Sequence, residues 1–414
     1  MTYLLQAVLA CVSTCLVIVW MRRPAERLGL IDHPGGRKRH DSATPLTGGL
    51  ALTLSLFLAL SFSLRALADY QVLLVAIAVL AVIGILDDRG QVFPRTKLGV
   101  QVLAAVLMTS WGNHFLHSLG DLFGRGPVDL MNWSIPLTVF ATVAVINAIN
   151  TFDGLDGLAG TLVLAILGYF AFFAYMLGDA NAMKFLVVLI GALLGFLAFN
   201  APLFGRGARS FMGDTGSQVL GIVVAWFSIQ FTQGNAEAPP PVTMLWVVGV
   251  VLLDFFTVTI RRVIRGRNPA TPDRGHIHHL LMRRGLSPLQ TVLLLVGVNL
   301  AFGAIGTAGW LLDWPEHLMF GGFLVVGLLY FGVFLFPTRF MRLSRRPRYA
   351  PVEARPATVG GDGWSLASDE ELTPVDAHAP PLLAPTSRSA LRQSLHRVAR
   401  RRRSAAEHSR PPGA

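Results

Sequence analysis

Charged residues are scarce in this chain. Asp, Glu, Lys and Arg together make up 14% of the 414 residues, well below the roughly 25% that is usual for soluble proteins. Hydrophobic residues make up 53%, and they come in runs of about twenty, long enough to cross the hydrocarbon core of a bilayer. This composition excludes a set of ordinary soluble domains and indicates a membrane protein.

Cysteine is nearly absent as well. Only Cys11 and Cys15 occur, one helical turn apart inside the first hydrophobic run. Neither a disulfide framework nor a sulfur-based metal site follows from two such residues. The chain also lacks an internal sequence repeat, which weakens an interpretation as a secondary transporter built from paired halves.

The hydrophobic runs predict eleven transmembrane helices. We expect them near residues 3–20, 45–64, 70–86, 98–115, 133–149, 158–177, 184–200, 217–232, 241–260, 288–311 and 317–336. With the N-terminus in the periplasm, only Arg65, Arg125 and Lys184 of the 35 basic residues fall outside the cytoplasmic loops and the C-terminal tail. Because cytoplasmic loops are enriched in Lys and Arg, we predict an all-α, polytopic membrane protein with a periplasmic N-terminus and a cytoplasmic C-terminus.

The C-terminal tail, residues 341–414, differs from the membrane domain, residues 1–340. It begins with a stretch rich in Pro, Gly and Arg, which is typical of disorder. A later stretch, SRSALRQSLHRVARRRRSA, is compatible with a short basic helix on the anionic inner leaflet and equally with a solvated tail. The net charge of +11 therefore comes mostly from the basic cytoplasmic loops, which determine the orientation in the membrane, and from this tail. Since no nucleic-acid-binding motif accompanies the charge, we expect membrane lipids and no nucleic acid among the partners.

Four separated loops, all expected on the cytoplasmic side, carry the acids, amides and histidines of interest. They contain Asp87 and Asp88 in GILDDRG, Asn147, Asn150, Asp153 and Asp156 in NAINTFDGLDG, Asp214 in FMGDTGS, and His276, His278 and His279 in PDRGHIHHLLMRRG. Acids at membrane depth are costly and therefore mark functional sites. Clustering at one membrane edge indicates a site where a water-soluble substrate meets a lipid, whereas acids scattered along the helices would indicate an ion pathway.

The ligand types in these loops favour a hard divalent cation. The residues Asn147, Asn150, Asp153 and Asp156 recur every three positions, near helical spacing, so they can share one face; a tight turn between two helices is the alternative. Carboxylate and amide oxygens suit Mg²⁺, with Mn²⁺ as a second choice, and both ions commonly bridge phosphate oxygens.

The histidine loop invites a metal interpretation, but its surroundings argue against one. Seven arginines between residues 261 and 284 flank it, and cations repel a metal ion while they attract phosphate. We therefore predict an anion-binding loop in place of a zinc site. Asp254 lies about 10 Å inside a predicted span, and the sequence leaves it open whether this acid supports the site or is a satisfied buried acid.

Together, the four motifs resemble those of the polyprenyl-phosphate N-acetylhexosamine-1-phosphate transferases. The resemblance runs from Leu30 to Gly285 and rests on the DD pair, N-x-x-N-x-x-D-G-x-D-G-L, F-M-G-D-x-G-S and D-R-x-H-I-H-H in this order. Within the family, LFGRGARSFMGDTGS and NPATPDRGHIHHLLMRRG are most similar to the enterobacterial type that uses a GlcNAc donor. Members that make the first lipid intermediate of peptidoglycan carry three consecutive histidines followed by an acid, and HIHHL departs from that pattern.

The resemblance implies a reaction and a location. The expected reaction is transfer of GlcNAc-1-phosphate from UDP-GlcNAc to undecaprenyl phosphate, which gives undecaprenyl-diphospho-GlcNAc and UMP. This step would start an O-antigen-type or enterobacterial-common-antigen-type polysaccharide at the cytoplasmic face of the bacterial inner membrane. Another UDP-N-acetylhexosamine donor, an anionic-sugar transporter and a noncatalytic scaffold that binds the lipid carrier remain as alternatives, and a homodimer is left open.

The resemblance also implies residue roles. Asp214 and Asn150 are expected to hold the metal ion. The expected catalytic residues are Asp87, Asp88, Asp153 and Asp156. Asp87 is the expected base, but a phosphate monoester is mostly dianionic at pH 7, so an orienting charge or a covalent phosphoryl intermediate stays open. Substrate binding is expected from Lys97, Asn147, His276, His278 and His279, and from Arg37, Lys38 and His40 in GRKRH.

Overall fold

The computed structural model describes residues 3–32, 43–63, 68–90, 92–201, 207–234, 237–267 and 275–335. The chain divides into a first unit, Met1–Val352, and a second unit, Glu353–Ala414. The second unit and the whole predicted tail, 341–414, lie outside the described residues. Three predicted substrate-binding residues, Arg37, Lys38 and His40, also lie outside them.

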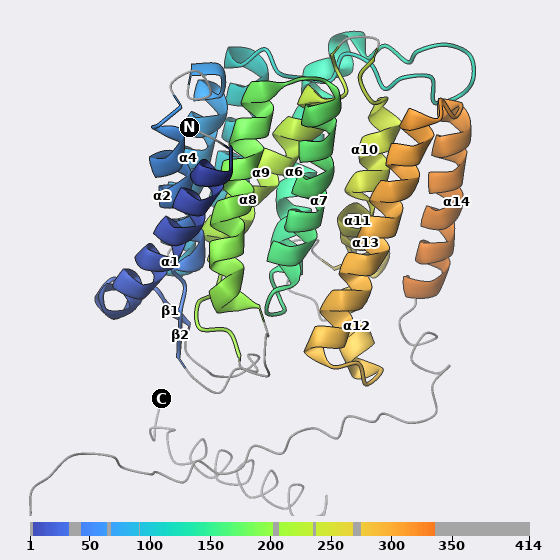
Figure 1. Cartoon of the computed structure of the whole chain (residues 1–414). Coiled ribbons are helices and arrows are strands. Elements are labelled where there is room, and N and C mark those ends of the chain that lie inside the picture. Colours follow the sequence, from blue (N-terminus) through green and yellow to red (C-terminus); the bar gives the residue numbers. More distant parts are fainter. Residues whose placement is uncertain are drawn as a thin grey trace, which may run out of the picture. The chain divides into compact units, whose positions relative to one another are not determined.

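The described residues of the first unit are mostly helical (Figure 1). The helices are α1 (Tyr3–Arg27), α2 (Gly48–Leu60), α4 (Gln71–Asp88), α5 (Pro94–Val106), η1 (Leu107–Trp111), η2 (Met131–Trp133), α6 (Ser134–Phe152), α7 (Leu158–Met176), α8 (Ala180–Asn200), α9 (Gly213–Gln230), α10 (Pro241–Val247), α11 (Gly249–Ile264), α12 (Ile277–Arg283), α13 (Pro288–Leu311) and α14 (Glu316–Phe334). Two short strands, β1 (Ile31–Asp32) and β2 (Thr44–Pro45), pair antiparallel, with Ile31 opposite Pro45.

Each of the eleven predicted segments contains a helix, but the helices differ in their capacity to cross a membrane. Among the described residues, seven helices are long and apolar enough, or eight if α10 and α11, bent by 77° at Val248, form one span. Helices α2 and α5 have only 13 residues each, and α9 opens with the polar stretch GDTGSQ. The chain is thus an all-helical polytopic membrane protein, while the count of eleven spans and the orientation stay predictions.

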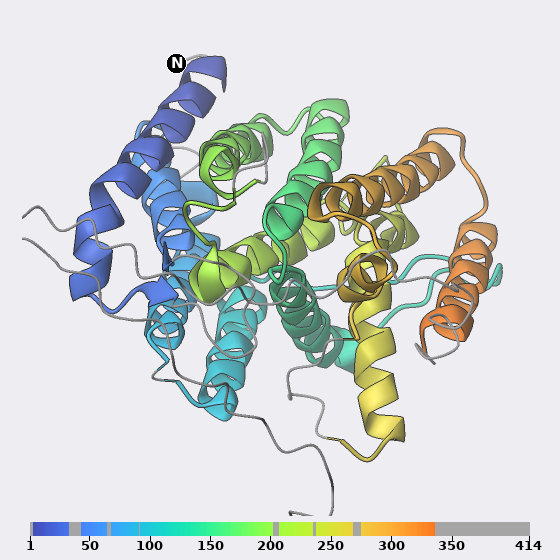
Figure 2. The same ribbon diagram turned by 90° about the horizontal axis from the view of Figure 1, so that it is seen from below.

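Helix α9 is the centre of the bundle. Nearly every side chain from Thr215 to Phe227 is buried, and α2, α4, α6 and α7 pack against it. In Figure 2, α9 lies between the blue N-terminal helices and the green helix α7. A helix enclosed by other helices does not need the apolar surface of a lipid-facing span, so α9 can carry polar residues.

The start of α9 is held against α2 by backbone contact. The Gly48 and Gly49 nitrogens donate hydrogen bonds to the carbonyl oxygens of Phe211 and Met212, both at 3.0 Å. A Cβ atom added at Gly49 would lie 2.2 Å from the backbone nitrogen of Gly216. Glycine is therefore required for this close approach, which fixes the first turn of α9 in place.

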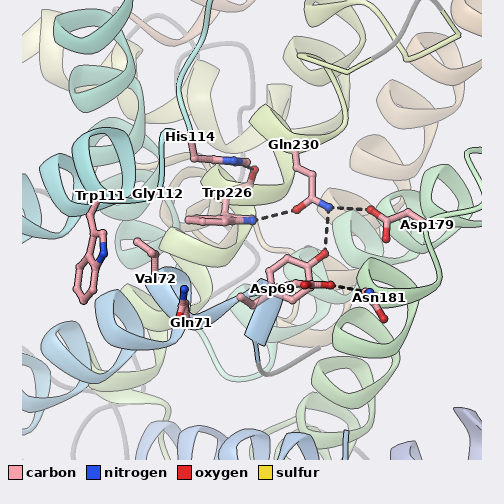
Figure 3. Close-up of a pocket in the computed structure, with 11 residues that line it drawn as sticks. Asp69, Gln71, Val72, Trp111, Gly112, His114, Asp179, Asn181, Trp226 and Gln230 are labelled. Atoms are coloured by element: carbon pink, nitrogen blue, oxygen red, sulfur yellow. Dashed lines mark hydrogen bonds between the residues drawn. The ribbon is translucent and has the colours of Figure 1, made fainter. Parts of the chain in front are cut away.

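The two ends of the bundle differ. In Figure 1, β1, β2 and α12 lie at the lower end, and the long connection between η1 and α6 lies at the upper end. A pocket of about 390 Å³ opens near that connection and contains none of the predicted site residues. In its lining, the Gln230 amide donates to the Tyr70 hydroxyl at 3.0 Å and to Asp179 Oδ2 at 2.8 Å (Figure 3). The predicted site residues Asp87, Asp88 and Asp214 therefore lie at one end of α4 and α9, and this pocket lies at the other end.

Candidate active site

Four helix ends bring five of the predicted residues together. Asp87 and Asp88 are the last two residues of α4, and Lys97 lies in the first turn of α5. Asn150 lies in the last turn of α6, and Asp214 is the second residue of α9. These residues are far apart in the sequence, so their convergence comes from the packing of α4, α5 and α6 around α9.

Lys97 bridges two of the carboxylates. Its Nζ atom lies 2.8 Å from Asp87 Oδ2 and 2.6 Å from Asp214 Oδ1. Burial alone would lower the pKa of Lys97, but the charges and hydrogen bonds of Asp214 and Asp87 outweigh it and raise that pKa above its ordinary value. Lys97 therefore stays charged. The cluster of Lys97, Asp87, Asp88 and Asp214 contains three carboxyl groups and one ammonium group, so it still carries more negative than positive charge.

Asn150 contacts the start of α9. Its Nδ2 atom donates hydrogen bonds to Asp214 Oδ1 and, at 2.8 Å, to Ser217 Oγ. With the amide nitrogen engaged in this way, the amide oxygen is the atom that can serve as a metal ligand. The amide orientation follows from the hydrogen-bond pattern.

Asp88 caps α9 from a neighbouring helix. Met212, at the N-cap position of α9, makes no side-chain cap hydrogen bond. Instead, Asp88 Oδ1 accepts from the Asp214 nitrogen at 2.6 Å, and Asp88 Oδ2 accepts from Thr215 Oγ1 at 2.7 Å and from the Thr215 nitrogen at 3.2 Å. A carboxylate at this position satisfies backbone N–H groups that have no partner inside the helix. Asp88 thereby fixes the backbone that carries Asp214.

The two asparagines of the N-x-x-N motif share a helix face, as predicted. Asn147 Nδ2 donates to Gln101 Oε1 of α5 at 2.8 Å and to the Val143 carbonyl at 2.8 Å. Gln101 in turn donates to Gln218 Oε1 of α9 at 3.2 Å. Asn147 thus contacts α5, and Asn150 contacts α9.

The predicted helical face does not continue through Asp153 and Asp156. Helix α6 ends at Phe152, so both aspartates lie in the turn before α7. Asp156 Oδ2 accepts from the Ala208 nitrogen at 3.1 Å, which ties this turn to the loop before α9. Burial raises the pKa of Asp153 well above its ordinary range, and the charges of Asp214, Asp88 and Asp156 add to that increase. A cation near Asp153 would relieve both effects.

The histidine motif lies at the same end of the bundle as this turn. His278 is 1% exposed, and neither of its ring nitrogens has a hydrogen-bond partner within the described ranges. A Cβ atom added at Gly154 would lie 3.0 Å from His278 Nε2, so the ring borders the turn that carries Asp153. Burial, and then the neighbouring His279 and His276, lower the pKa of His278 well below its ordinary value, which makes this ring neutral at pH 7.

The donor types present fit a hard cation that is completed by substrate. Within the part of the chain that the structure describes, no three His, Cys, Asp or Glu side chains are arranged to hold a metal ion by themselves. Asp214, Asp87 and the Asn150 amide oxygen offer the oxygen donors that Mg²⁺ prefers. Mg²⁺ usually takes one or two carboxylates and fills its other positions with phosphate oxygens and water, so a complete protein cage is not required.

Several residues that shape the site were missed in the sequence. Thr215 and Ser217 belong to F-M-G-D-T-G-S, but only the aspartate of that motif was singled out. Gln101 and Asn200 are single polar residues in apolar runs, a signal that could have drawn attention to them. Asn200 Oδ1 accepts from the Gly157 nitrogen at 2.8 Å, and its Nδ2 donates to the Ser210 carbonyl at 3.0 Å. It therefore joins the aspartate turn to the loop before α9.

Comparison with known proteins adds independent support. The family model of glycosyl transferase family 4 matches residues 70–232. Three proteins, each named undecaprenyl-phosphate alpha-N-acetylglucosaminyl 1-phosphate transferase, are similar over most of their length. The protein of Yersinia pestis is 34% identical (78% of this chain, 91% of the relative), that of Haemophilus influenzae 36% (80% and 94%), and that of Escherichia coli K12 33% (77% and 87%).

Proposed function

The chain belongs to glycosyl transferase family 4, and we propose that it transfers GlcNAc-1-phosphate from UDP-GlcNAc to undecaprenyl phosphate, with release of UMP. The product is undecaprenyl-diphospho-GlcNAc. One observation carries the proposal beyond similarity: Lys97, Asp87 and Asp214 meet within hydrogen-bond distance at one end of the bundle. This is also the end that carries the aspartate turn.

The charge of this cluster supports a requirement for Mg²⁺. Both substrates are anionic phosphates, and the cluster has an excess of carboxylates around a single ammonium group. Anionic substrates would be repelled unless a cation is added. Asp214 and Asn150 would hold that ion, and the bound ion would neutralise charge at phosphorus.

The protein residues themselves supply positioning. Lys97 holds the Asp87 and Asp214 carboxylates in a fixed relation, and Asp88 holds the backbone of Asp214. In phosphoryl transfer, positioning and charge neutralisation provide most of the rate increase. Asp87 orients the lipid phosphate, which is largely dianionic at pH 7. A phosphoryl-Asp87 intermediate fits the same arrangement and would be marked by ping-pong kinetics.

For orientation, we propose that this end of the bundle faces the cytoplasm of a bacterial cell. The arginines and lysines of the predicted cytoplasmic loops support this orientation under the positive-inside rule. The eleven-span topology with a periplasmic N-terminus is part of the same proposal.

Donor identity can be tested directly with purified protein in detergent, undecaprenyl phosphate and Mg²⁺. We expect UMP release from UDP-GlcNAc, and none from UDP-GalNAc or UDP-MurNAc-pentapeptide. Omission of the lipid phosphate is the control for simple hydrolysis. Release from another donor alone would keep the chemistry and replace the substrate, whereas no release from any donor by folded protein would contradict the proposal and favour a transporter or a scaffold.

A second prediction concerns Gly213. Its φ angle is +68°, and an added Cβ atom would lie 2.6 Å from Asp88 Oδ2. We expect Gly213→Ala to lower the rate of UMP release at least tenfold, because the carboxylate that caps α9 must move and the Asp214 backbone moves with it. The left-handed conformation adds strain of roughly 1–2 kcal/mol.

Gly178 offers a matched control for this strain. Its φ angle is also +68°, and an added Cβ atom would meet nothing within 4 Å. Gly178→Ala should lower the thermal unfolding temperature to a similar extent and keep its activity. Equal activities of the two variants would show that the contact between Gly213 and Asp88 is unimportant.

A further inference from the structure

Asp254 has a specific task that the sequence left undecided. It lies in α11, is 2% exposed, and accepts hydrogen bonds from three groups. His276 Nδ1 lies 2.7 Å from its Oδ2, the Ile277 nitrogen donates to its Oδ1 at 2.9 Å, and the Tyr330 hydroxyl of α14 donates to the same Oδ1 at 2.9 Å. One buried carboxylate thus joins α11, α14 and the start of the histidine helix α12.

This arrangement fixes which nitrogen of His276 carries a proton. Oδ1 already accepts from two donors, and an ionised carboxylate can only accept. His276 Nδ1 must therefore donate to Oδ2, and Nε2 is the ring atom left for a ligand. A carboxylate that accepts from Nδ1 fixes the orientation of the ring, as in other carboxylate–histidine pairs. An Nε2 atom that carries a proton donates a hydrogen bond that phosphate can accept.

The neighbouring ring, that of His278, has different contacts. The His278 and His276 rings are stacked with their centroids 6.0 Å apart and an interplanar angle of 12°. No carboxylate contacts His278 among the described residues, and burial keeps the ring neutral. Of the two stacked rings, His276 alone has a hydrogen-bonded carboxylate. Among the charged and titratable groups of the described residues, Asp254 and His278 contact His276 directly. Arg261 contacts the carbonyl of the preceding Gly275, Tyr330 contacts Asp254, and His279 contacts His278.

We propose that Asp254 is a positioning residue that holds His276 with Nε2 directed at the phosphate groups of the UDP-sugar donor. This inference rests on the proposed function. Asp254 acts through His276 and does not touch substrate itself. Tyr330, from the last described helix, donates a hydrogen bond to the Asp254 carboxylate and so keeps it in position beside the start of α12.

The decisive experiment is a double-mutant cycle between Asp254→Asn and His276→Gln, measured as UMP release in the full-length protein. In Asp254→Asn, the Ile277 nitrogen and the Tyr330 hydroxyl keep the remaining oxygen on their side, so the amide nitrogen must face His276 Nδ1. The charge is lost and the ring must turn or move its proton. We expect kcat/KM for UDP-GlcNAc to fall roughly 10- to 100-fold, with the loss in the KM for UDP-GlcNAc and an unchanged KM for undecaprenyl phosphate.

In the His276→Gln background, Asp254→Asn should lower kcat/KM for UDP-GlcNAc by less than about a further twofold. The effects of substitutions at two residues that act as one unit are not additive. Asp254→Glu, which keeps the charge, should recover part of the lost kcat/KM. Tyr330→Phe, which keeps the carboxylate and its contact with His276, should affect the KM for UDP-GlcNAc less than Asp254→Asn does.

The outcomes separate this inference from the proposed function. If the unmodified protein releases no UMP, the proposed function fails first. If it is active and the two losses multiply, or both KM values rise together, Asp254 is only a structural residue and the inference is wrong. If Asp254→Asn does not fold, the comparison of His276→Gln with Asp254→Glu/His276→Gln decides in the same way: a further loss in the double variant overturns the inference, and equal activities support it.

Discussion

Replacement of Asp214 by asparagine should reduce UMP release by roughly 1,000-fold, which corresponds to about 4 kcal/mol of transition-state stabilisation. Asp214 Oδ1 accepts hydrogen bonds from both Lys97 and Asn150, and its carboxylate is the expected metal ligand. An amide of the same shape keeps the helix start but lacks the negative charge. The loss should therefore appear in kcat measured at saturating UDP-GlcNAc and undecaprenyl phosphate.

The fold should survive this substitution. The Asp214 backbone nitrogen and the Thr215 side chain still donate to Asp88, so the capping of α9 is unchanged. The thermal unfolding temperature in detergent provides the check, and binding of undecaprenyl phosphate should persist. A variant that keeps more than a tenth of the activity would remove Asp214 from the list of metal ligands. Retained lipid binding with no turnover would also separate an enzyme from a noncatalytic scaffold, for which Asp214 should be dispensable.

The sequence was sufficient to predict an all-helical membrane protein in which Asp87, Asn150 and Asp214 lie at the same end of the bundle. Hydrophobic runs of membrane length have few alternatives to helix, because backbone polar groups in lipid must be satisfied within the chain. Helices that alternate in direction also bring every second loop to the same side. That rule predicts that Asp87, Asn150 and Asp214 lie on the same side without any knowledge of tertiary contacts.

The sequence could not show which partners these residues select. Lys97 is predicted to bind substrate, and the sequence does not indicate that it bridges Asp87 and Asp214. Such pairings depend on how α4, α5 and α9 are rotated against each other. The end of α6 at Phe152 was also hidden, since the threefold spacing of polar residues continues past it. Likewise, the link from Asp254 to His276 spans a helix end and a loop, and no periodic pattern reports it.

The break between α10 and α11 illustrates the same limit. The run 241–260 is apolar apart from Asp254 and its threonines and predicts one straight span, yet the helix bends by 77° at Val248. Neither a proline nor a polar residue marks the bend within the run. The bend accompanies a close contact of Gly249 with Phe302 and Phe323, where an added Cβ atom would lie 2.9–3.0 Å from their rings. Tertiary packing is therefore associated with a break that hydropathy does not reveal.

Replacement of Lys97 by methionine tests whether the bridging charge is as important as the carboxylates. Methionine fills a similar volume but leaves Asp87 and Asp214 facing each other without a cation, and like charges at this distance disfavour the ionised forms. We expect UMP release to fall roughly 100-fold, as for the loss of one preorganised electrostatic contact. We also expect a lower thermal unfolding temperature in metal-free buffer, and Mg²⁺ should raise that temperature more in the variant than in the parent chain.

Lys97→Arg separates the charge from its position. Arginine keeps the positive charge, so the thermal unfolding temperature should recover. Its planar fork cannot place one nitrogen between the two carboxylates as the lysine Nζ does, so activity should recover only in part. Full recovery with arginine would mean that net charge alone suffices. A normal rate in Lys97→Met would show that the Asp87–Lys97–Asp214 bridge is a feature of the resting site that substrate binding replaces, and the role of Lys97 in positioning Asp87 would then have to be abandoned.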